Sequence, residues 1–301
     1  MRNFYLCGME ERKKLMAIIN PFSGNSKKEH VPQLLEDIID HDKFDFKIEL
    51  VTREMRVSDL AAKAVKEGYY GVIAIGGDGT VNGAASSLTD SDVALAIIPC
   101  GSGNGLARHL EIPMNMKKAI EIINNDHVEV CDYCTLNDKT FVCTGGMGFD
   151  AEIADRYAKR TTRGSLNYVK TAFQVYAHYK PIHCTFEIDG EVIEEDVFVI
   201  TCANASQYGN NAYIAPHASI QDGLLDITVI KPFKRIECGI VGGSLYTKTV
   251  HKNRHVDTYK AREIKIHTSE PHVYHIDGEP MEQITDMTVT CHPGGIKFFV
   301  K

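Results

Sequence analysis

The sequence predicts an α/β domain with a parallel sheet over residues 1–130, followed by an antiparallel β-sandwich domain over residues 131–301. Before residue 130, continuously apolar runs alternate with segments whose apolar residues recur at helical spacing, which is typical of parallel strands covered on both faces. After residue 130, short alternating or β-branched runs are separated by Gly, Asp and Pro, which is typical of antiparallel strands. In this organisation the last strand can return to the first domain.

Apolar spacing defines the first two pairs of strand and helix. A strand is expected from Leu15 to Ile19, before the loop Asn-Pro-Phe-Ser-Gly at residues 20–24. The helix after this loop has apolar residues at positions 31, 34, 35, 38 and 39. A second strand is expected from Phe46 to Val51, and the next helix has apolar residues at positions 60, 61, 64 and 65.

The stretch GVIAIGGDGTVNG, residues 71–83, places Asp78 among glycines after an apolar run. Asp-Gly between apolar residues is one form of hairpin turn. However, apolar residues follow at positions 81, 84, 85 and 88, which is one face of a helix. The stretch therefore predicts a strand, a glycine loop and a helix whose N-terminus suits phosphate. A carboxylate there fits phosphoryl transfer, in which a divalent metal or a reacting hydroxyl lies between it and the phosphate.

A similar pattern follows in VALAIIPCGSGNGLARHL, residues 93–110, where a buried strand is expected to run into a loop with three glycines. The carboxyl ends of parallel strands share one edge of a sheet, and open α/β sheets bind ligands at that edge. We therefore expect Asn20, Thr52, Asp78, Ser102 and Asn104 to gather there. The absence of a G-x-x-x-x-G-K-[ST] loop and of a full G-x-G-x-x-G argues against a Walker ATPase and a standard dinucleotide fold.

In the second half, one helix is expected within residues 164–179. Leu166, Val169, Phe173 and Tyr176 share one face of it, and Arg163 and Lys170 lie nearby.

Composition restricts the class of protein. The start of the chain has no apolar signal region and no run of about 18 apolar residues occurs, so a cytosolic protein is expected. Nine scattered cysteines fit reduced thiols, and Cys131 and Cys134 have no second pair at zinc-ligand spacing. A net charge of -7 argues against nucleic acid as a partner.

Five motifs occur in a fixed order: NPFSG at 20–24, GGDGT at 76–80, PCGSGNGLAR at 99–108, DGLLD at 222–226 and DGEPM at 277–281. Together they resemble the diacylglycerol kinase catalytic-domain family of soluble lipid kinases, which includes bacterial diacylglycerol kinases and sphingosine kinases. The resemblance extends from Lys14 to the end of the chain. GGDGT alone is shared with NAD kinases. The resemblance implies a fold of the NAD kinase and diacylglycerol kinase type, with a cleft between the two domains where ATP with Mg²⁺ meets a lipid hydroxyl.

The resemblance also implies roles for individual residues. Asp78 matches an acidic residue essential for catalysis, and Glu279 matches the general base. The positions expected to bind nucleotide are Asn20, Pro21, Ser23, Gly24, Thr52, Gly76, Gly77, Gly79, Thr80, Asn82, Ser102 and Asn104. In the DGLLD loop, the resemblance implies a structural Mg²⁺ held by Asp222 with Ser219 and Leu224.

The acceptor lipid is left open between diacylglycerol and a sphingoid base. The GSGN form of the third motif is nearer to sphingosine kinases, and Glu152 in GFDAEIAD aligns with an acid that contacts an amino-alcohol head group in those enzymes. Many bacterial relatives carry GFDA regardless of their substrate. Candidate head-group residues are Asp150, Glu152 and Asp132, the last also matching an acidic residue of the family's magnesium network.

A lipid kinase without a spanning helix has to reach its membrane from outside. Residues 231–265 carry nine Lys or Arg against three acids, which reverses the sign of the whole chain. Our hypothesis is that this segment docks peripherally on anionic lipid at the inner face of the membrane. A solvated basic face is the alternative, and a homodimer would be ordinary for the family.

Two other functions remain open. GGDGT alone is compatible with a kinase that acts on a soluble nucleotide such as NAD. A non-catalytic protein that senses nucleotide or lipid is also compatible with these loops, although the presence of both Asp78 and Glu279 argues against it.

Overall fold

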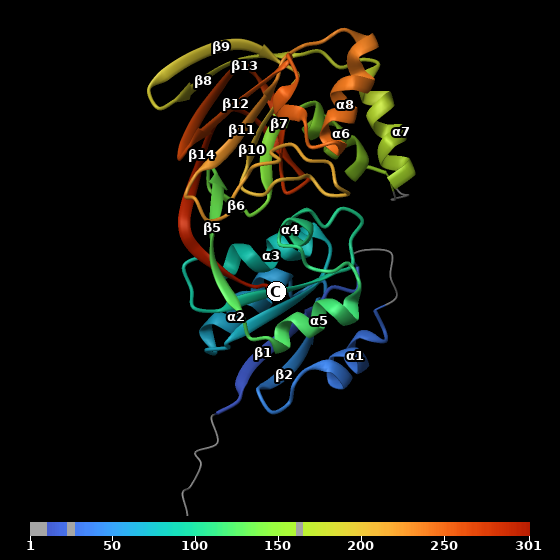
Figure 1. Ribbon diagram of the computed structural model, residues 1–301, viewed down its shortest axis with the longest axis vertical. Coiled ribbons are helices and arrows are strands. Elements are labelled where there is room, and N and C mark those ends of the chain that lie inside the picture. The colour runs from blue at the N-terminus through green and yellow to red at the C-terminus, as the bar shows by residue number, and fades with distance from the viewer. Residues whose placement is uncertain (1–10, 23–27, 161–164) are drawn as a thin grey trace, which may run out of the picture.

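The computed structural model describes residues 11–22, 28–160 and 165–301, with only the backbone at residues 165, 166, 168 and 169. Figure 1 shows the N-terminal half at the bottom of the view, with helices around a sheet, and the C-terminal half above it, with most of the remaining strands. The predicted combination of an α/β part and an antiparallel β part is confirmed.

The N-terminal part alternates strands and helices. Its elements are β1 (Lys13–Ile19), α1 (Val31–Ile38), β2 (Phe44–Leu50), α2 (Val57–Lys66), β3 (Gly71–Gly76), α3 (Asp78–Leu88), β4 (Ala94–Pro99), α4 (Gly105–His109) and α5 (Met116–Asn124). The strands are parallel in the order β4-β3-β1-β2. Every residue of β3 and β4 is buried, as expected for strands with helices on both faces. Ile75 pairs with Ile19 on one side and Ile98 on the other, so these strands end at one level.

The C-terminal part is built on antiparallel pairs. Its elements are β5 (Val128–Leu136), β6 (Lys139–Phe141), β7 (Thr144–Gly148), α6 (Phe149–Ala158), α7 (Ser165–Tyr176), β8 (Ile182–Ile188), β9 (Glu191–Val197), β10 (Val199–Ala203), β11 (Leu225–Ile230), η1 (Arg235–Glu237), α8 (Cys238–Tyr246), η2 (Val250–Lys252), β12 (Val256–Ala261), β13 (Glu263–Ile276) and β14 (Glu279–Phe299). In β8 every second residue is buried, which is the alternation expected when one face of a strand packs on a core. In Figure 1, α6, α7 and α8 lie together on one side of these strands.

β14 joins the two halves. Its first residues pair with β13, its middle and end pair with β5, and Phe298 pairs in parallel with Leu95 of β4. The described strands therefore form one continuous sheet rather than two separate ones. Because β5 and β14 run together through the junction, the backbone shows no break at residue 130, and the predicted domain boundary stays a prediction.

Four α-helices differ from the sequence analysis, which did not predict α5, α6 or α8. In α6 only three residues are buried, and α8 carries no charged residue, so neither shows a clear apolar face beside a charged one. The helix expected within residues 164–179 is α7, but Arg163 and the side chains of Leu166 and Val169 lie outside the described residues. Phe173 is exposed and Tyr176 is half-buried, so these two residues do not share one environment. None of the helices that the structure describes is both long and apolar enough to cross a membrane.

We predict that Gly146→Ala destabilises the protein, because a Cβ at residue 146 in β7 would lie 2.2 Å from the carbonyl oxygen of Ile200 in β10. Forcing an atom into such a packed position costs about 1 to 3 kcal/mol in the free energy of unfolding. Gly242→Ala in α8 is the matched control, since nothing lies within 4 Å of the added Cβ. That substitution should be neutral or stabilising by up to about 1 kcal/mol. Urea unfolding measures both, and equal effects would contradict the packing of β7 on β10.

Candidate active site

The two glycine loops after β3 and β4 lie against each other. Gly76 pairs with Pro99, so the loops that follow start side by side. A Cβ on Gly101 would lie 2.6 Å from the Cα of Gly77, so the close approach of the two backbones requires glycine. The predicted gathering of motif residues at the carboxyl edge of the parallel strands is therefore seen for these two loops.

Asp78 connects the two loops through both of its carboxylate oxygens. Oδ1 accepts a hydrogen bond from the N–H of Gly105 at 2.7 Å, and Oδ2 accepts one from the N–H of Asn104 at 2.9 Å. Burial raises the pKa of the Asp78 carboxyl above its ordinary value, and the backbone N–H groups partly oppose that shift. Each oxygen keeps a second lone pair for another ligand.

Asn104 shapes the loop that Asp78 holds. Its backbone is left-handed, with φ of 51°, and its side chain bonds the N–H and the carbonyl of Gly101. Ser102 is exposed at the tip of the same loop. This conformation directs the N–H groups of Asn104 and Gly105 at Asp78, so the predicted ligand Asn104 has a structural role here.

The loop after β1 contributes an amide and a buried amine. Nδ2 of Asn20 donates to Oγ1 of Thr80 at 3.2 Å, and Nζ of Lys28 donates to the carbonyl of Asn20 at 2.5 Å. Lys28 is buried, and this burial lowers its pKa. The sequence analysis missed Lys28, although a pair of lysines begins three residues after the NPFSG loop. Pro21 adjoins Asn20 and is exposed.

Four of the predicted nucleotide ligands are not seen at the two adjacent glycine loops. Ser23 and Gly24 fall outside the described residues. Thr52 is exposed after β2, where its Oγ1 accepts the N–H of Met55 at 3.1 Å. Asn82 faces the C-terminal part and donates to the carbonyl of Thr140 and to Asp277. The nucleotide-binding role of these residues, like that of the other predicted ligands, stays a prediction.

Glu279 lies over the glycine loop of Asp78. It starts β14 directly after a tight turn in which Asp277 and Gly278 have φ of 48° and 81°. A Cβ on Gly79 would lie only 2.1 Å from Oε1 of Glu279. The carboxylate of Glu279 thus lies against the residue that follows Asp78, although the two are far apart in the sequence, and Glu279 is exposed toward solvent.

Asp277 was not predicted as a site residue, yet it fixes this turn. Its buried carboxylate accepts N–H groups from Val142 (3.1 Å), Cys143 (2.9 Å) and Thr144 (2.9 Å). Asn82 of α3 donates the fourth hydrogen bond at 2.9 Å. Burial raises the pKa of Asp277, against the effect of these donors. The residue therefore ties α3, which Asp78 begins, to the turn that carries Glu279.

A loop of the C-terminal part, residues 206–211, closes over Gly103. The carbonyl of Gly103 accepts the N–H of Asn210 at 3.1 Å and Nε of Arg108 at 3.0 Å. A Cβ on Gly209 would lie 2.8 Å from Gly103, so a glycine is needed here too. The sequence analysis missed this loop, whose only local signal is Gly-Asn-Asn after a strand.

The residues expected to hold a structural Mg²⁺ have other partners. Oδ2 of Asp222 lies 2.8 Å from Nζ of Lys260, and its Oδ1 accepts the N–H of Leu224. Oγ of Ser219 accepts the N–H of Gln221 at 3.3 Å. A cluster of three or more His, Cys, Asp or Glu suited to a metal is absent from the part of the chain that the structure describes. The ammonium of Lys260 places beside Asp222 the positive charge that a metal ion would bring. The predicted metal site stays a prediction.

Asp132 is buried and acts on two loops. Its oxygens accept the N–H of Gly223, beside Asp222, at 2.7 Å and the N–H of Gly294 at 2.8 Å. It is not among the residues that line the pocket beside Glu152. The carboxylate therefore holds the DGLLD loop against the end of β14.

The side chains of Asp150 and Glu152 have different surroundings: Asp150 bonds neighbouring side chains, and Glu152 lines a pocket. Oδ2 of Asp150 accepts hydrogen bonds from the hydroxyl of Tyr208 at 2.7 Å and Oγ1 of Thr201 at 3.2 Å, and lies 3.1 Å from Nε2 of His275. Glu152 instead lines a pocket of about 250 Å³. Both residues lie in the first turn of α6, where positions i and i+2 do not face each other.

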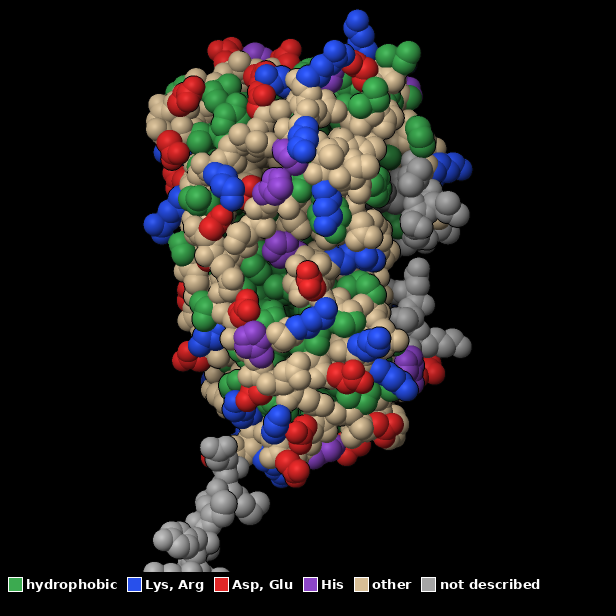
Figure 2. Space-filling model, viewed as in Figure 1, with side chains coloured by type: hydrophobic (Ala, Val, Ile, Leu, Met, Phe, Trp, Pro, Cys, Tyr) green, Lys and Arg blue, Asp and Glu red, His purple; other side chains and the backbone are tan. Residues whose placement is uncertain are grey.

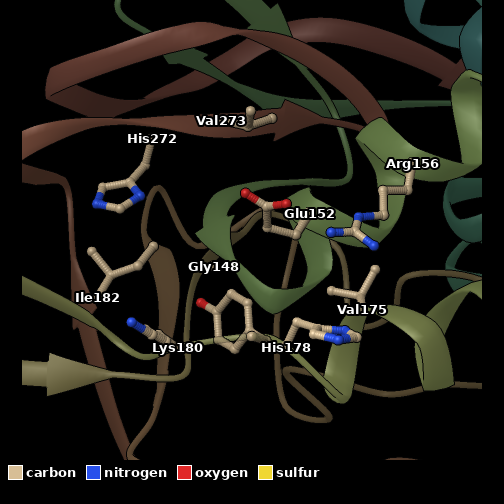
Figure 3. Close-up of a pocket in the computed structure, with 10 residues that line it drawn as sticks. Gly148, Glu152, Arg156, Val175, His178, Lys180, Ile182, His272 and Val273 are labelled. Carbon is tan, nitrogen blue, oxygen red and sulfur yellow. The ribbon is translucent and has the colours of Figure 1, made fainter.

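Figure 3 shows that pocket, with the carboxylate of Glu152 directed into it. The other lining side chains that carry or can carry positive charge come from α6, from the segment after α7 and from β13. They are Arg156, His178, Lys180 and His272.

We predict that Asp277→Asn destabilises the protein. Each oxygen of Asp277 accepts two N–H groups, so the amide nitrogen of Asn would face two donors whichever way it turns. Two buried donors left without an acceptor cost about 1 to 3 kcal/mol each in the free energy of unfolding. Asp286→Asn, at an exposed position on β14, should change it little. Urea unfolding compares the variants, and an unchanged Asp277→Asn would show that this carboxylate does not hold the turn.

Comparison with known proteins agrees with this geometry. The diacylglycerol kinase catalytic domain matches residues 14–136, and the YegS C-terminal NAD kinase beta sandwich-like domain matches residues 143–300. An uncharacterized protein of Synechocystis is 31% identical, covering 94% of this chain and 69% of its own length. Diacylglycerol kinases of Mycobacterium tuberculosis and Bacillus subtilis are 28% and 27% identical, covering 88% and 89% of this chain and 88% and 90% of their own length.

Solved structures show the same fold. A diacylglycerol kinase from Bacillus anthracis superposes with a TM-score of 0.72 at 21% identity, over 96% of this chain and 97% of the other. An NAD kinase from Archaeoglobus fulgidus in complex with ATP superposes with a TM-score of 0.52 at 12% identity, over 95% and 93%. With two consecutive domain matches, the second over more than half of the chain, and relatives named diacylglycerol kinase and probable YegS-like lipid kinase, the chain belongs to the diacylglycerol kinase and YegS-like lipid kinase family.

Proposed function

We propose that this protein transfers the γ-phosphoryl group of ATP to the hydroxyl of a neutral lipid alcohol such as diacylglycerol. The observation that carries the proposal is the position of Glu279, whose carboxylate lies against Gly79 in the loop that Asp78 anchors. Relatives named diacylglycerol kinase in Mycobacterium tuberculosis and Bacillus subtilis support the same reaction class.

The residues at this edge suit the chemistry of phosphoryl transfer. The hydroxyl of an alcohol has a pKa far above neutral, so a carboxylate that accepts its proton late in the reaction assists the transfer. Glu279 is exposed and adjacent to the phosphate loop, and we assign it that role. The glycine loops, the start of α3 and the ammonium of Lys28 provide N–H groups and positive charge for phosphate oxygens.

The same edge fits a magnesium ion that accompanies ATP. Oxygen is the ligand Mg²⁺ prefers, and both oxygens of Asp78 keep a lone pair after their backbone hydrogen bonds. A bound Mg²⁺ would neutralise charge on the phosphates. Asp78 itself keeps the loops of β3 and β4 in one geometry, so that the N–H groups around it stay oriented.

The pocket beside Glu152 favours a neutral acceptor over a sphingoid base. Its lining contains one carboxylate but also Arg156 and Lys180, together with two histidines. A cationic amine in this pocket would be attracted by Glu152 and repelled by Arg156 and Lys180, whereas a neutral glycerol backbone meets no such repulsion. Sphinganine remains the second candidate, because Glu152 points into the pocket.

We predict that Glu279→Gln and Asp78→Asn each lower kcat at least 100-fold, since both remove a carboxylate from the reacting edge. The measurement is transfer of phosphate from radiolabelled ATP with Mg²⁺ to diacylglycerol, sphinganine, ceramide, monoacylglycerol and NAD. Asp286→Asn is the control and should keep the activity. Transfer to NAD alone, or full activity in Glu279→Gln, would refute the proposal. ATP binding without any transfer would favour a non-catalytic sensor.

The pH dependence of the reaction tests the state of Asp78. Because burial raises its pKa, we predict that kcat/KM falls with decreasing pH through a range above the ordinary pKa of an Asp carboxyl, about 3.9. A carboxyl whose pKa is raised in the folded state binds its proton more tightly there than in the unfolded chain, so its protonation stabilises the fold as the pH falls. Loss of activity with retained thermal stability is therefore expected, and an activity that stays constant down to the ordinary range would contradict the prediction.

The predicted cytoplasmic site at the inner face of the membrane and the homodimer both remain proposals. Membrane association and the proposed lipid acceptor share one requirement, namely a surface of the protein that reaches lipid.

A further inference from the structure

The outer face of α8 is apolar where a surface helix normally carries charge. The sequence of α8, CGIVGGSLY, contains no charged residue. Ile240 is 69% exposed and Ile236, in η1 just before the helix, is 88% exposed. Tyr246 is also exposed on the last turn. A helix that faces only water would be expected to carry polar and charged side chains on this face.

α7 adds another apolar side chain to this surface. Arg235 of η1 donates from Nη2 to the carbonyl of Ala177 at 3.4 Å, and the rings of Tyr176 and Phe233 stack with centroids 6.5 Å apart. The start of η1 therefore packs on the C-terminal end of α7. One turn before Ala177, Phe173 is 70% exposed.

We call the set of Phe173, Ile236, Ile240 and Tyr246 the α7–α8 edge. Figure 1 shows α7 and α8 next to each other at one corner of the molecule. In Figure 2, hydrophobic side chains at that corner have Lys and Arg side chains at their margin.

Part of the positive charge of residues 231–265 is offset by neighbouring acidic side chains. Four of the nine basic residues form ion pairs with acidic side chains: Lys231, Arg254, Lys260 and Lys265. Lys248 lies over the ring of Tyr213. Among the described residues, no ion pair involves Lys234, Arg235, Lys252 or Arg262, all of which are exposed. Of these four residues, Lys234 and Arg235 directly precede Ile236 and so give the apolar edge a cationic margin.

We propose that the α7–α8 edge docks on a bilayer that contains anionic lipid. The apolar side chains enter the interfacial region, and Lys234 and Arg235 meet the lipid phosphates. This inference rests on the proposed lipid substrate, and it adds which surface of the protein reaches the substrate.

A bilayer fits this edge better than a second copy of the chain does. In a two-fold dimer the same patch meets itself, so the Lys234 and Arg235 of both copies would be brought together. The nearest acid, Glu237, already pairs with Arg254 and His255. An anionic membrane supplies the missing negative charge.

The edge also lies beside the acceptor pocket. Val175 of α7 and His178, two residues beyond its end, line the pocket that holds Glu152. Phe173 belongs to the same helix. A membrane on the α7–α8 edge would therefore lie beside the pocket that we assign to the lipid head group.

The test is binding of the full chain to vesicles by co-sedimentation. Vesicles of phosphatidylcholine alone are compared with vesicles of phosphatidylcholine and phosphatidylglycerol, at low and high salt. Ile236→Asp/Ile240→Asp should bind both kinds of vesicle at least tenfold more weakly than the parent. Val192→Asp on β9 is the matched control, because Val192 is 64% exposed and lies outside the edge. It should bind as the parent does.

A second variant separates charge from apolar contact. Lys234→Ala/Arg235→Ala should lose about 30-fold in binding to the anionic vesicles at low salt, since each basic residue near such a surface contributes about fivefold. Its binding to phosphatidylcholine alone should stay unchanged. The melting temperature of each variant shows whether it is folded.

The outcomes distinguish this inference from the proposed function. Unchanged vesicle binding in both double variants, with folding retained, would overturn the docking surface. A change from dimer to monomer in Ile236→Asp/Ile240→Asp on size-exclusion chromatography, without a change in vesicle binding, would assign the edge to a second copy and also overturn it. Phosphorylation of a short-chain, water-dispersed diacylglycerol should stay unchanged in both variants. If the parent phosphorylates no lipid at all, the proposed function fails while the vesicle result stands on its own.

Discussion

The arrangement of the site depends on a buried carboxylate that accepts four N–H groups. Asp277 binds the backbone of residues 142–144 and the side chain of Asn82, so one side chain joins β7, the turn before β14 and α3. Because an unsatisfied group is costly in this buried place, the turn has few alternative positions. Glu279, two residues later, is thereby set over the loop of Asp78. The two parts of the chain meet at the position where their polar groups satisfy one another.

Two other acidic residues also accept hydrogen bonds from backbone N–H groups of separate segments. Asp78 bonds the N–H groups of Asn104 and Gly105, and Asp132 bonds those of Gly223 and Gly294. A carboxylate among glycines can thus orient backbone amides in addition to any role toward metal or phosphate. Glycine is required at Gly77 and Gly101 for a related reason. The two loop backbones approach each other too closely for a Cβ at either residue.

The acceptor side of the site has a different physical character. The pocket beside Glu152 mixes one acid with cationic side chains, and the neighbouring α7–α8 edge is apolar with a cationic margin. A glycerolipid likewise has an uncharged polar head group that continues into apolar chains. The fold places these two environments on consecutive helices, α6 and α7, and α6 packs on β7, β13 and β14.

The sequence by itself determined the local elements and the motif loops of this protein. Apolar spacing predicted the strands that precede Asn20, Thr52 and Asp78, because periodicity depends only on neighbours in the chain. Only the tertiary structure decided which loops meet. The contact of Glu279 with Gly79, the four donors of Asp277 and the closure of residues 206–211 over Gly103 join segments far apart in sequence, and no local pattern encodes them. The same holds for Asp150 and Glu152, which sequence reasoning grouped and the helix α6 separated, since a helix turns residues two apart in different directions.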